Sequence, residues 1–419
     1  MRAAICIRLY LAMAIVAGAA PARSDDNVAA ISDRATLLDG PGSPKEALRA
    51  RGISTEVWVT QYYQGLVSGT GNNDGEYGTK ADAFVTLDGA KLGLWNGLFV
   101  SIHQEWIAGE DANNRSGTLL PVNTALALPR LGGFERDTSI LVTQAFSPAV
   151  SLTAGKFNMQ DVLAKTPLLG GGGVDTFMNL GLALPITGIT PPYVLGANLS
   201  VKTEPAVFGL FVYDPRNAQS WDVIENPFSD GTVVLGSVTV PVKPFGLPGT
   251  QVLKAAFSTQ DGLDLADVPQ LLLPPESSAV AGREDGRWFL SYGFQQYLFQ
   301  NSADPRQGWG VFAQIGASEG NPNPIELSYF GGLAGSSPVP GRDLDRWGIG
   351  YFRYNISDDL IEGLDTIGIG LRDEEGVEAF YNLAVTPWFR VTADVQYIEP
   401  VRKDREDATF LGLRSQVKF

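Results

Sequence analysis

The chain has 419 residues, of which 44% are hydrophobic and only 18% are charged, and it contains 48 Gly, 21 Phe, 13 Tyr and 8 Trp. The formal net charge of −15 excludes the basic surface that a nucleic-acid-binding protein needs. After residue 22, no apolar run reaches the roughly 18 residues of a membrane-spanning helix. Low charge with many glycines and aromatic residues instead favours a lipid-facing sheet.

Residues 1–22 have the three parts of a secretory signal peptide. Arg2 and Arg8 form the positive region, an apolar stretch follows over residues 9–19, and Ala20-Pro21-Ala22 offers small residues for cleavage. An uncleaved anchor is the alternative, but the apolar stretch is short for one. We therefore expect cleavage after Ala22.

Cleavage would change what the mature chain can contain. It would remove Cys6, the only cysteine, and so exclude disulfides and cysteine-bound metals. It would also remove Arg2 and Arg8, which changes the net charge from −15 to −17 because residues 1–22 contain no acid. This acidic balance argues against an anion-selective pore, although only weakly, because many of the acids lie in predicted loops.

Residues 23–51 form a polar leader with one predicted helix. Ser43 and Glu46 have the spacing of a capping box, Pro44 stands at the first helical position, and Gly52 suits the end of a helix. The sequence predicts a helix of about two turns. It either fills part of the periplasmic mouth of the barrel or belongs to a solvated tail.

Residues 52–419 are dominated by a period of two. Leu195, Ala197, Leu199 and Val201 alternate with Gly196, Asn198, Ser200 and Lys202, and the same alternation occurs in segments 81–88, 98–105, 377–386 and 390–397. One face of each segment is apolar and the other holds polar or ionisable groups. A soluble sandwich could show this alternation too.

The number and length of these segments favour a membrane barrel. We count about 16 segments of roughly 8–12 residues, the length that a tilted strand needs to cross the hydrocarbon. Aromatic residues cluster near the segment ends: Tyr62, Tyr63, Trp95, Trp106, Trp288, Trp309, Trp347, Trp388 and Tyr397. Rings at headgroup level form such girdles. An open edge would leave backbone groups unpaired in lipid, so we expect a closed, transmembrane, antiparallel all-β barrel.

The connections alternate in length, as they do in outer-membrane barrels. Tight turns are predicted at 147–148, 203–205 and 386–387, and longer polar loops at 68–78, 107–136, 214–230, 261–285, 319–324 and 399–407. Gly170-Gly171-Gly172-Gly173 is no P-loop, because Val174-Asp175-Thr176 follows where Gly-Lys-Ser/Thr is required. The run either lets the loop 158–192 fold back into the barrel or makes an exposed loop flexible.

The last strand carries a further signal. Leu411, Leu413, Val417 and Phe419 share one face, opposite Arg414, Gln416 and Lys418. A final amphipathic strand that ends in Phe419 resembles the signal by which the barrel-assembly machinery recognises bacterial outer-membrane barrels. We therefore expect the chain to be located in the bacterial outer membrane.

Several of these segments resemble the carbohydrate-selective porins of the outer membrane. The resemblance is clearest over residues 376–388, with Thr386-Pro387-Trp388 at the turn, and over 390–398; further matches lie at 51–53, 154–157 and 177–179. It implies a barrel of 16 strands, a constriction built by inward-folded loops, and passive diffusion of monosaccharides or polyols. The loops 107–136 and 261–285 match nothing known to us, so the solute is left open.

A sugar channel needs hydrogen-bonding groups and aromatic faces along a wet constriction. The alternation places the following residues toward the lumen, as candidate pore-lining and substrate residues: Asp82, Phe84, His103, Glu105, Lys202, Arg287 and Gln295. His103 and Glu105 stand two positions apart, so both could reach one solute. Alternatively, they line a hydrated wall in a network of ion pairs.

Other functions find less support in the sequence. The chain has a single histidine and contains neither a Gly-x-Ser-x-Gly nor a His-Glu-x-x-His motif. We therefore expect no catalytic residues, no cofactor and no metal site. The acids of 261–267 lack a complete calcium-loop ligand set, although acidic loops could share divalent ions with lipopolysaccharide. A general or non-sugar porin is the nearest alternative; a structural or adhesive barrel and a barrel hydrolase are more distant. Nothing in the sequence indicates the oligomeric state.

Overall fold

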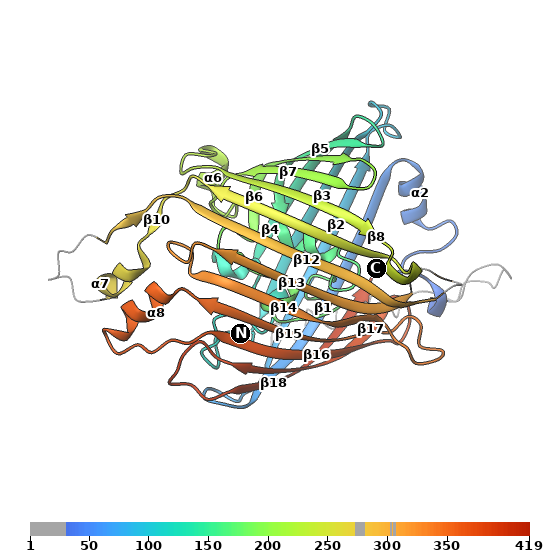
Figure 1. The fold of residues 1–419 in the computed structure, drawn as a ribbon. Coiled ribbons are helices and arrows are strands. Elements are labelled where there is room, and N and C mark those ends of the chain that lie inside the picture. Colours follow the sequence, from blue (N-terminus) through green and yellow to red (C-terminus); the bar gives the residue numbers. More distant parts are fainter. Residues whose placement is uncertain (1–30, 273–280, 302–303, 305–306) are drawn as a thin grey trace.

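The computed structural model describes residues 31–272, 281–301, 304 and 307–419. Within these residues, sixteen strands form one closed antiparallel barrel, as the sequence predicts (Figure 1). Each strand pairs with the next one along the wall, and β1 pairs with β18, with Trp58 opposite Lys418, to close it. The predicted signal peptide, residues 1–22, lies outside the described part of the chain.

The barrel strands have the following bounds: β1 Ile53–Ser68, β2 Glu76–Asp88, β3 Leu98–Gly109, β4 Arg136–Ala145, β5 Val150–Asn158, β6 Tyr193–Lys202, β7 Val207–Tyr213, β8 Val233–Val242, β9 Gly249–Ser258, β12 Arg287–Gln300, β13 Gly308–Ser318, β14 Ile325–Ser336, β15 Arg346–Ile356, β16 Glu374–Ala384, β17 Phe389–Glu399 and β18 Ala408–Lys418. Two short strands, β10 (Gly262–Leu263) and β11 (Arg283–Glu284), pair with each other outside the wall.

The helices are short: η1 Ile31–Asp33, α2 Pro44–Ala50, α3 Thr124–Ala127, η2 Arg130–Gly132, α4 Met159–Ala164, α5 Leu180–Ala183, α6 Trp221–Glu225, η3 Pro244–Gly246, η4 Leu265–Asp267, α7 Val268–Leu272 and α8 Asp358–Asp365. In the described part of the chain, none of them has the length and apolar character needed to cross a membrane.

Helix α2 confirms the predicted helix of the leader. The hydroxyl of Ser43 accepts a hydrogen bond from the backbone N–H of Glu46 at 3.2 Å, and the Glu46 carboxylate accepts one from the N–H of Gly42 at 2.7 Å. Lys45 donates from Nζ to the backbone oxygen of Phe419 at 2.9 Å. The helix therefore caps itself and holds the chain end beside it.

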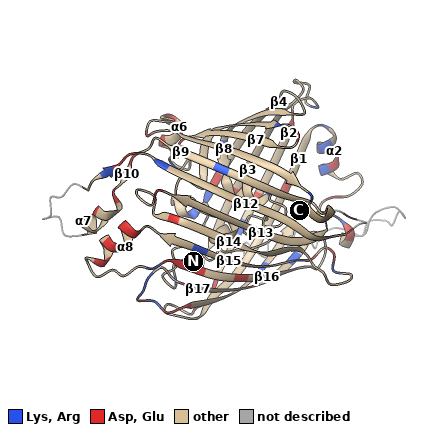
Figure 2. Ribbon diagram, in the orientation of Figure 1, with Lys and Arg blue, Asp and Glu red and all other residues tan. Residues whose placement is uncertain are grey.

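The two faces of the wall differ as the alternation predicts. On β18, Leu411 and Leu413 are about half exposed on the outer face, whereas Phe410, Arg414 and Gln416 are buried on the inner face. Charged residues gather in the loops and helices at the two ends of the barrel, and the strands between are largely free of them (Figure 2). A belt that is poor in charge and carries apolar residues such as Leu411 and Leu413 on its outer face suits contact with lipid tails.

Most of the predicted aromatic residues lie on the outer face in two bands. Tyr63, Trp106, Trp288 and Tyr397 are exposed toward one end of their strands, and Trp95 is exposed at the other end. Tyr62 is an exception and corrects the prediction. Its side chain points inward and is 1% exposed, because neighbouring residues of a strand face opposite sides.

The connections divide the barrel into two ends. The short-turn end holds the turns 146–149, 203–206 and 385–388, and lies with α2 and the C-terminus at the right of Figure 1. The long-loop end holds α6, α7, α8 and β10 at the left. Two of the long loops fold into the lumen, and they create the site described next.

Candidate functional site

Two segments fold into the barrel from the long-loop end: the first inward loop, residues 110–135, and the second inward loop, residues 159–192. Every residue of α3 in the first and of α5 in the second is buried. In the second, Phe177 is fully buried with its ring edge-on to Phe380 of β16 at 4.9 Å and to Phe312 of β13 at 5.7 Å. Apolar packing of this kind holds the loops against the wall.

Two glutamates of β16 anchor the inward loops through their backbone N–H groups. Glu374 accepts hydrogen bonds from the N–H groups of Leu119 and Leu120 in the first loop. Glu378 accepts them from Met178 and from Asn179, the latter at 2.9 Å, in the second loop. Each carboxylate thereby satisfies two donors that would otherwise be unpaired inside the barrel.

The two loops also bind each other and the glycine run. The N–H of Thr124 donates to the carbonyl of Met178 at 2.8 Å, and that of Leu180 to the carbonyl of Pro121 at 2.9 Å. Gly171, Gly172 and Gly173 all have positive φ, and the carbonyl of Gly173 accepts from Arg414 Nη1 at 2.7 Å. The glycine run thus allows the tight inward fold, which confirms the predicted constriction loop.

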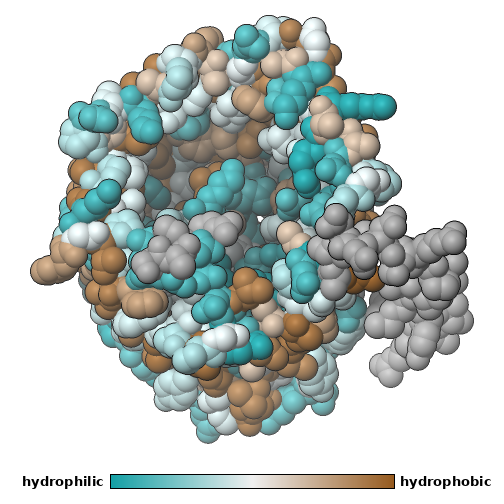
Figure 3. All heavy atoms as spheres, turned by 90° about the vertical axis from the view of Figure 1, so that its right-hand side faces the viewer, coloured by the Kyte–Doolittle hydropathy of each residue, from teal (hydrophilic) through white to brown (hydrophobic). Residues whose placement is uncertain are grey.

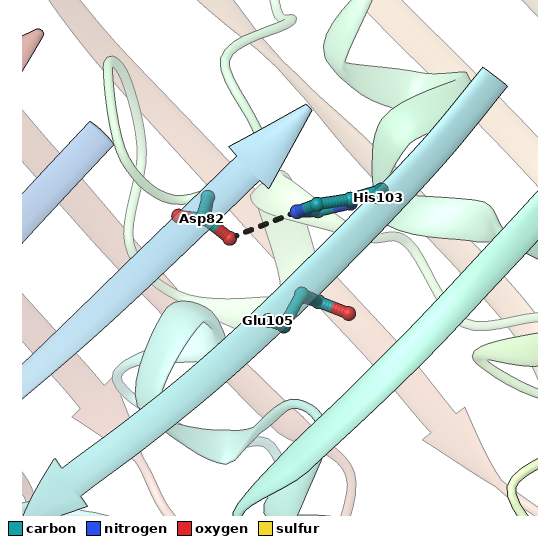
Figure 4. A group of neighbouring side chains, drawn as sticks. All are labelled: Asp82, His103 and Glu105. Carbon is teal, nitrogen blue, oxygen red and sulfur yellow. Dashed lines mark hydrogen bonds and ion pairs between the residues drawn. The ribbon is translucent and has the colours of Figure 1, made fainter. Parts of the chain in front are cut away.

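Asp82 of β2 and His103 and Glu105 of β3 lie together on the inner wall (Figure 4). His103 contacts Asp82 through Nε2 at 3.0 Å and Asp161 of α4 through Nδ1 at 2.8 Å. Both ring nitrogens therefore face carboxylates, one on the wall and one on the second inward loop. The Phe84 ring stacks on the imidazole with 4.1 Å between centroids.

Glu105 completes a buried network of ion pairs and hydrogen bonds. Its Oε1 lies 2.6 Å from Lys80 Nζ, and its Oε2 accepts from Asn158 Nδ2 and from Tyr193 Oη, each at 2.9 Å. Ligand atoms of Asp82, His103 and Glu105 lie within 4.8 Å of one another, as a metal site would require. The Lys80 ammonium already pairs with the carboxylates of Glu105 and Asp82, so the donor set fits an ion-pair network better than a cation site.

The part of the lumen that the inward loops leave open forms a channel cavity of about 400 Å³. It lies between the second inward loop and the wall made by β8, β9, β12 and β13. Its lining is Leu128, Leu131, Met159, Val162, Leu163, Thr166, Leu169, Leu180, Leu184, Pro185, Ile186, Thr187, Thr190, Pro191, Pro192, Leu235, Thr239, Thr250, Val252, Lys254, Phe289, Ser291, Gly293, Phe294, Gln295, Phe312, Ala313, Gln314 and Phe330.

The channel cavity adjoins a second cavity. At the long-loop end it shares Ile186, Thr190 and Pro191 with a second cavity of about 420 Å³, the outer vestibule, whose lining includes Arg287. Viewed from the short-turn end, the barrel is hollowed near its centre, where hydrophilic residues are visible (Figure 3). The two cavities are thus neighbours, joined at Ile186, Thr190 and Pro191.

The two sides of the channel cavity differ in chemistry. The wall supplies hydrogen-bonding groups from neighbouring strands: Thr239, Thr250, Lys254, Ser291, Gln295 and Gln314. The second inward loop supplies mostly apolar groups, among them Leu163, Leu184 and Ile186. A solute with hydroxyl groups on its rim and an apolar ring face could contact both sides.

The seven predicted residues all belong to the inward-facing sets of their strands, but only Gln295 lines the channel cavity. Asp82, His103 and Glu105 are buried in the network beneath α4. Arg287 lines the outer vestibule, and Lys202 is exposed at the short-turn end of β6. Their contact with a solute stays a prediction.

Sequence reasoning missed Lys254, Ser291, Glu374 and Glu378. Lys254 and Ser291 follow the same alternation, but it does not tell which part of the wall the inward loops leave free. Glu374 and Glu378 occupy inward positions of β16. An ionisable group inside a membrane-spanning wall is a sequence signal for a functional residue or a structural anchor, and it could have identified both.

The sequence matches the carbohydrate-selective porin, OprB family, over residues 73–419. Porin B of Pseudomonas aeruginosa is 26% identical over 193 residues, which cover 41% of this chain and 42% of that protein. The chain thus matches less than half of the length of this curated relative.

Two solved structures are similar in fold. The high-pH structure of Pseudomonas putida OprB has a TM-score of 0.79 at 18% identity and covers 93% of this chain and 100% of that one. The low-pH structure of the same protein has a TM-score of 0.54 at 15% identity and covers 93% and 99%. At these identities the likeness establishes the fold alone.

Proposed function

The chain belongs to the OprB family of carbohydrate-selective porins, and on this basis we propose that it lets small sugars diffuse passively across the bacterial outer membrane. The observation that carries the proposal is the channel cavity, with hydrogen-bonding groups on the wall and apolar groups on the second inward loop. Wall groups such as Ser291 and Gln295 replace water on sugar hydroxyls while the ring slides over Leu184 and Phe289. Each contact of this kind is weak by itself, as passage requires.

The size of the cavity supports monosaccharides and polyols as solutes. About 400 Å³ lies toward the lower end of the roughly 300–1,000 Å³ that small-molecule sites occupy. The anchoring of the inward loops by Glu374 and Glu378 keeps the cavity from widening. We therefore expect a sharp fall in rate between monosaccharides and larger oligosaccharides.

Swelling of liposomes that contain the purified protein tests this proposal. Pentoses and hexoses should enter quickly, disaccharides slowly, and trisaccharides no faster than into protein-free liposomes. Amino acids and inorganic phosphate of comparable size test the alternative of a general or non-sugar porin. A clear preference for either class over hexoses would overturn the sugar assignment and leave the channel in place.

The family supports a channel rather than an enzyme, and we propose that the chain has no catalytic activity. The single histidine, His103, is engaged by Asp82 and Asp161 at both ring nitrogens. A lipase or protease activity of the purified protein that is abolished in His103→Ala would contradict the proposal. A structural or adhesive barrel would show neither conductance in planar bilayers nor solute uptake.

We further propose that residues 1–22 are removed on export, that 23–51 form the leader, and that 52–419 form the barrel. Sequencing the N-terminus of protein isolated from outer membranes tests the cleavage after Ala22. The outward residues Leu411, Leu413 and Phe419 support recognition by the barrel-assembly machinery. The acidic loop 261–267 supports shared divalent ions with lipopolysaccharide, which chelator-dependent loosening of bound lipopolysaccharide would test.

A further inference from the structure

Lys254 of β9 stands out among the residues that line the channel cavity. It carries the only ionisable side chain in that lining, as far as the structure describes the chain. It lies near the middle of β9, which runs from Gly249 to Ser258, and so about midway between the two ends of the barrel. An ionisable group at this depth of a membrane protein marks a functional site, and its partner has to be identified.

No partner for Lys254 is found in the described residues, where its side chain makes neither an ion pair nor a hydrogen bond. Its register neighbours are Ser237 on β8 and Ser291 on β12, which offer hydroxyl groups only. Two other inward lysines differ: Lys80 pairs with Glu105 at 2.6 Å, and Lys418 with Asp175 at 2.9 Å. Lys254 therefore faces the channel cavity with no counter-ion among the described residues.

An ammonium group among uncharged groups attracts an anion more strongly than it would in bulk water. A lysine ammonium is a single compact cation, and among the described residues the lining contains no arginine whose forked guanidinium would suit a phosphoryl group. Ser237 and Ser291 can donate to the same anion from either side. The apolar face of the second inward loop, with Leu163 and Leu184, remains available to the carbon chain of a polyol.

We propose that Lys254, with Ser237 and Ser291, forms a subsite for the carboxylate of acidic sugars such as aldonates and uronates. The channel then passes these monoanions more readily than neutral sugars of the same size. This inference rests on the proposed function, since it names a solute class for the same path. The net charge of −15 argued against an anion-selective pore. The inference differs from that expectation, because the one ionisable side chain described in the lining of the channel cavity is a lysine.

The test compares gluconate with glucose in liposomes that contain the wild-type protein, Lys254→Met, Lys254→Gln or Lys254→Arg. Lys243→Met is the matched control, because Lys243 is an exposed lysine in the turn that joins β8 to β9 and does not line the channel cavity. Heat-dependent migration in detergent gels confirms that each variant is folded. The zero-current potential in a salt gradient, measured in planar bilayers, gives a second readout that involves no sugar.

We expect the ratio of gluconate to glucose uptake to fall about tenfold in Lys254→Met and Lys254→Gln, which corresponds to about 1.4 kcal/mol. The ratio should stay near the wild-type value in Lys254→Arg and in Lys243→Met. The zero-current potential should shift toward cation preference in Lys254→Met and Lys254→Gln. Glucose uptake itself should change less than twofold.

Three results would overturn the inference in distinguishable ways. If gluconate and glucose uptake fall together, Lys254 is a hydroxyl donor and the carboxylate assignment is wrong, although the sugar channel stands. If glucose 6-phosphate depends on Lys254 more than gluconate does, the subsite serves phosphoryl groups instead. If the wild-type protein admits no neutral sugar, the proposed function fails, and an unshifted zero-current potential would then also exclude an anion subsite.

Discussion

Replacing Glu378 by alanine should loosen the constriction. Its carboxylate accepts hydrogen bonds from the backbone N–H groups of Met178 and Asn179 at the start of α5. Alanine leaves both donors unpaired in a buried place, at about 1–3 kcal/mol each, so the closed position of the second inward loop should lose about 2–6 kcal/mol. The population with this loop displaced should then rise at least roughly 30-fold.

Single-channel recording in planar bilayers would detect the displaced loop. Glu378→Ala should show additional, larger conductance levels and should admit disaccharides into liposomes, and Glu378→Gln, which keeps one acceptor oxygen, should show a smaller effect. Glu362→Ala is the control, because Glu362 is an exposed glutamate of α8. If folded Glu378→Ala gives the conductance, noise and disaccharide exclusion of the wild type, the anchoring role of Glu378 is refuted.

Three further predictions concern the packing and charge of the loops. Phe177→Ala should lower the free energy of unfolding by about 3–5 kcal/mol, because the ring is fully buried; an unchanged urea midpoint in detergent would contradict this. Gly181→Leu should lower the conductance, because a Cβ at Gly181 would lie 2.9 Å from the Phe352 ring of β15 and push the loop toward the channel cavity; a conductance equal to wild type argues against it. Burial opposes ionisation of Asp214, but hydrogen bonds from Arg216 and from the Phe228 N–H outweigh it and lower the pKa of this carboxyl below its ordinary value of 3.8. The ionised Asp214 carboxylate therefore stabilises the folded loop above that value, and this stabilisation is lost as the pH falls through the lowered pKa. Proteolysis of loop 214–232 should be unchanged from pH 7 to pH 5 and increase only below about pH 4.

The wall of this barrel could be predicted from local sequence, because a closed sheet imposes one rule on every strand. Successive side chains face opposite sides, so alternation alone assigned Asp82 and Gln295 to the lumen and Leu411 to the lipid. The same rule shows why Tyr62 could not join the aromatic band of Tyr63. Turn chemistry and the capping box of Ser43 were likewise local signals.

The interior of the lumen could not be predicted in the same way, because long-range contacts build it. Glu378 meets Met178 across 200 residues of sequence, and no local pattern indicates which wall a loop will cover. Alternation could place His103 and Glu105 on the inner face, but it could not show that they are buried with Lys80 beside Asp161 of α4. Lys254 looks like any inward lysine until the cavity beside it is known.

Chemical blockage of the channel cavity tests the account most directly. Ser291 lies on its wall, and Cys6 is the only natural cysteine and precedes the expected cleavage site, so Ser291→Cys would give the mature chain a single thiol. After complete modification with a bulky thiol reagent, glucose uptake into liposomes should fall to the level of protein-free vesicles, while the same treatment of the wild-type protein should change nothing. Undiminished glucose uptake through the fully modified Ser291→Cys protein would show that sugars take another path.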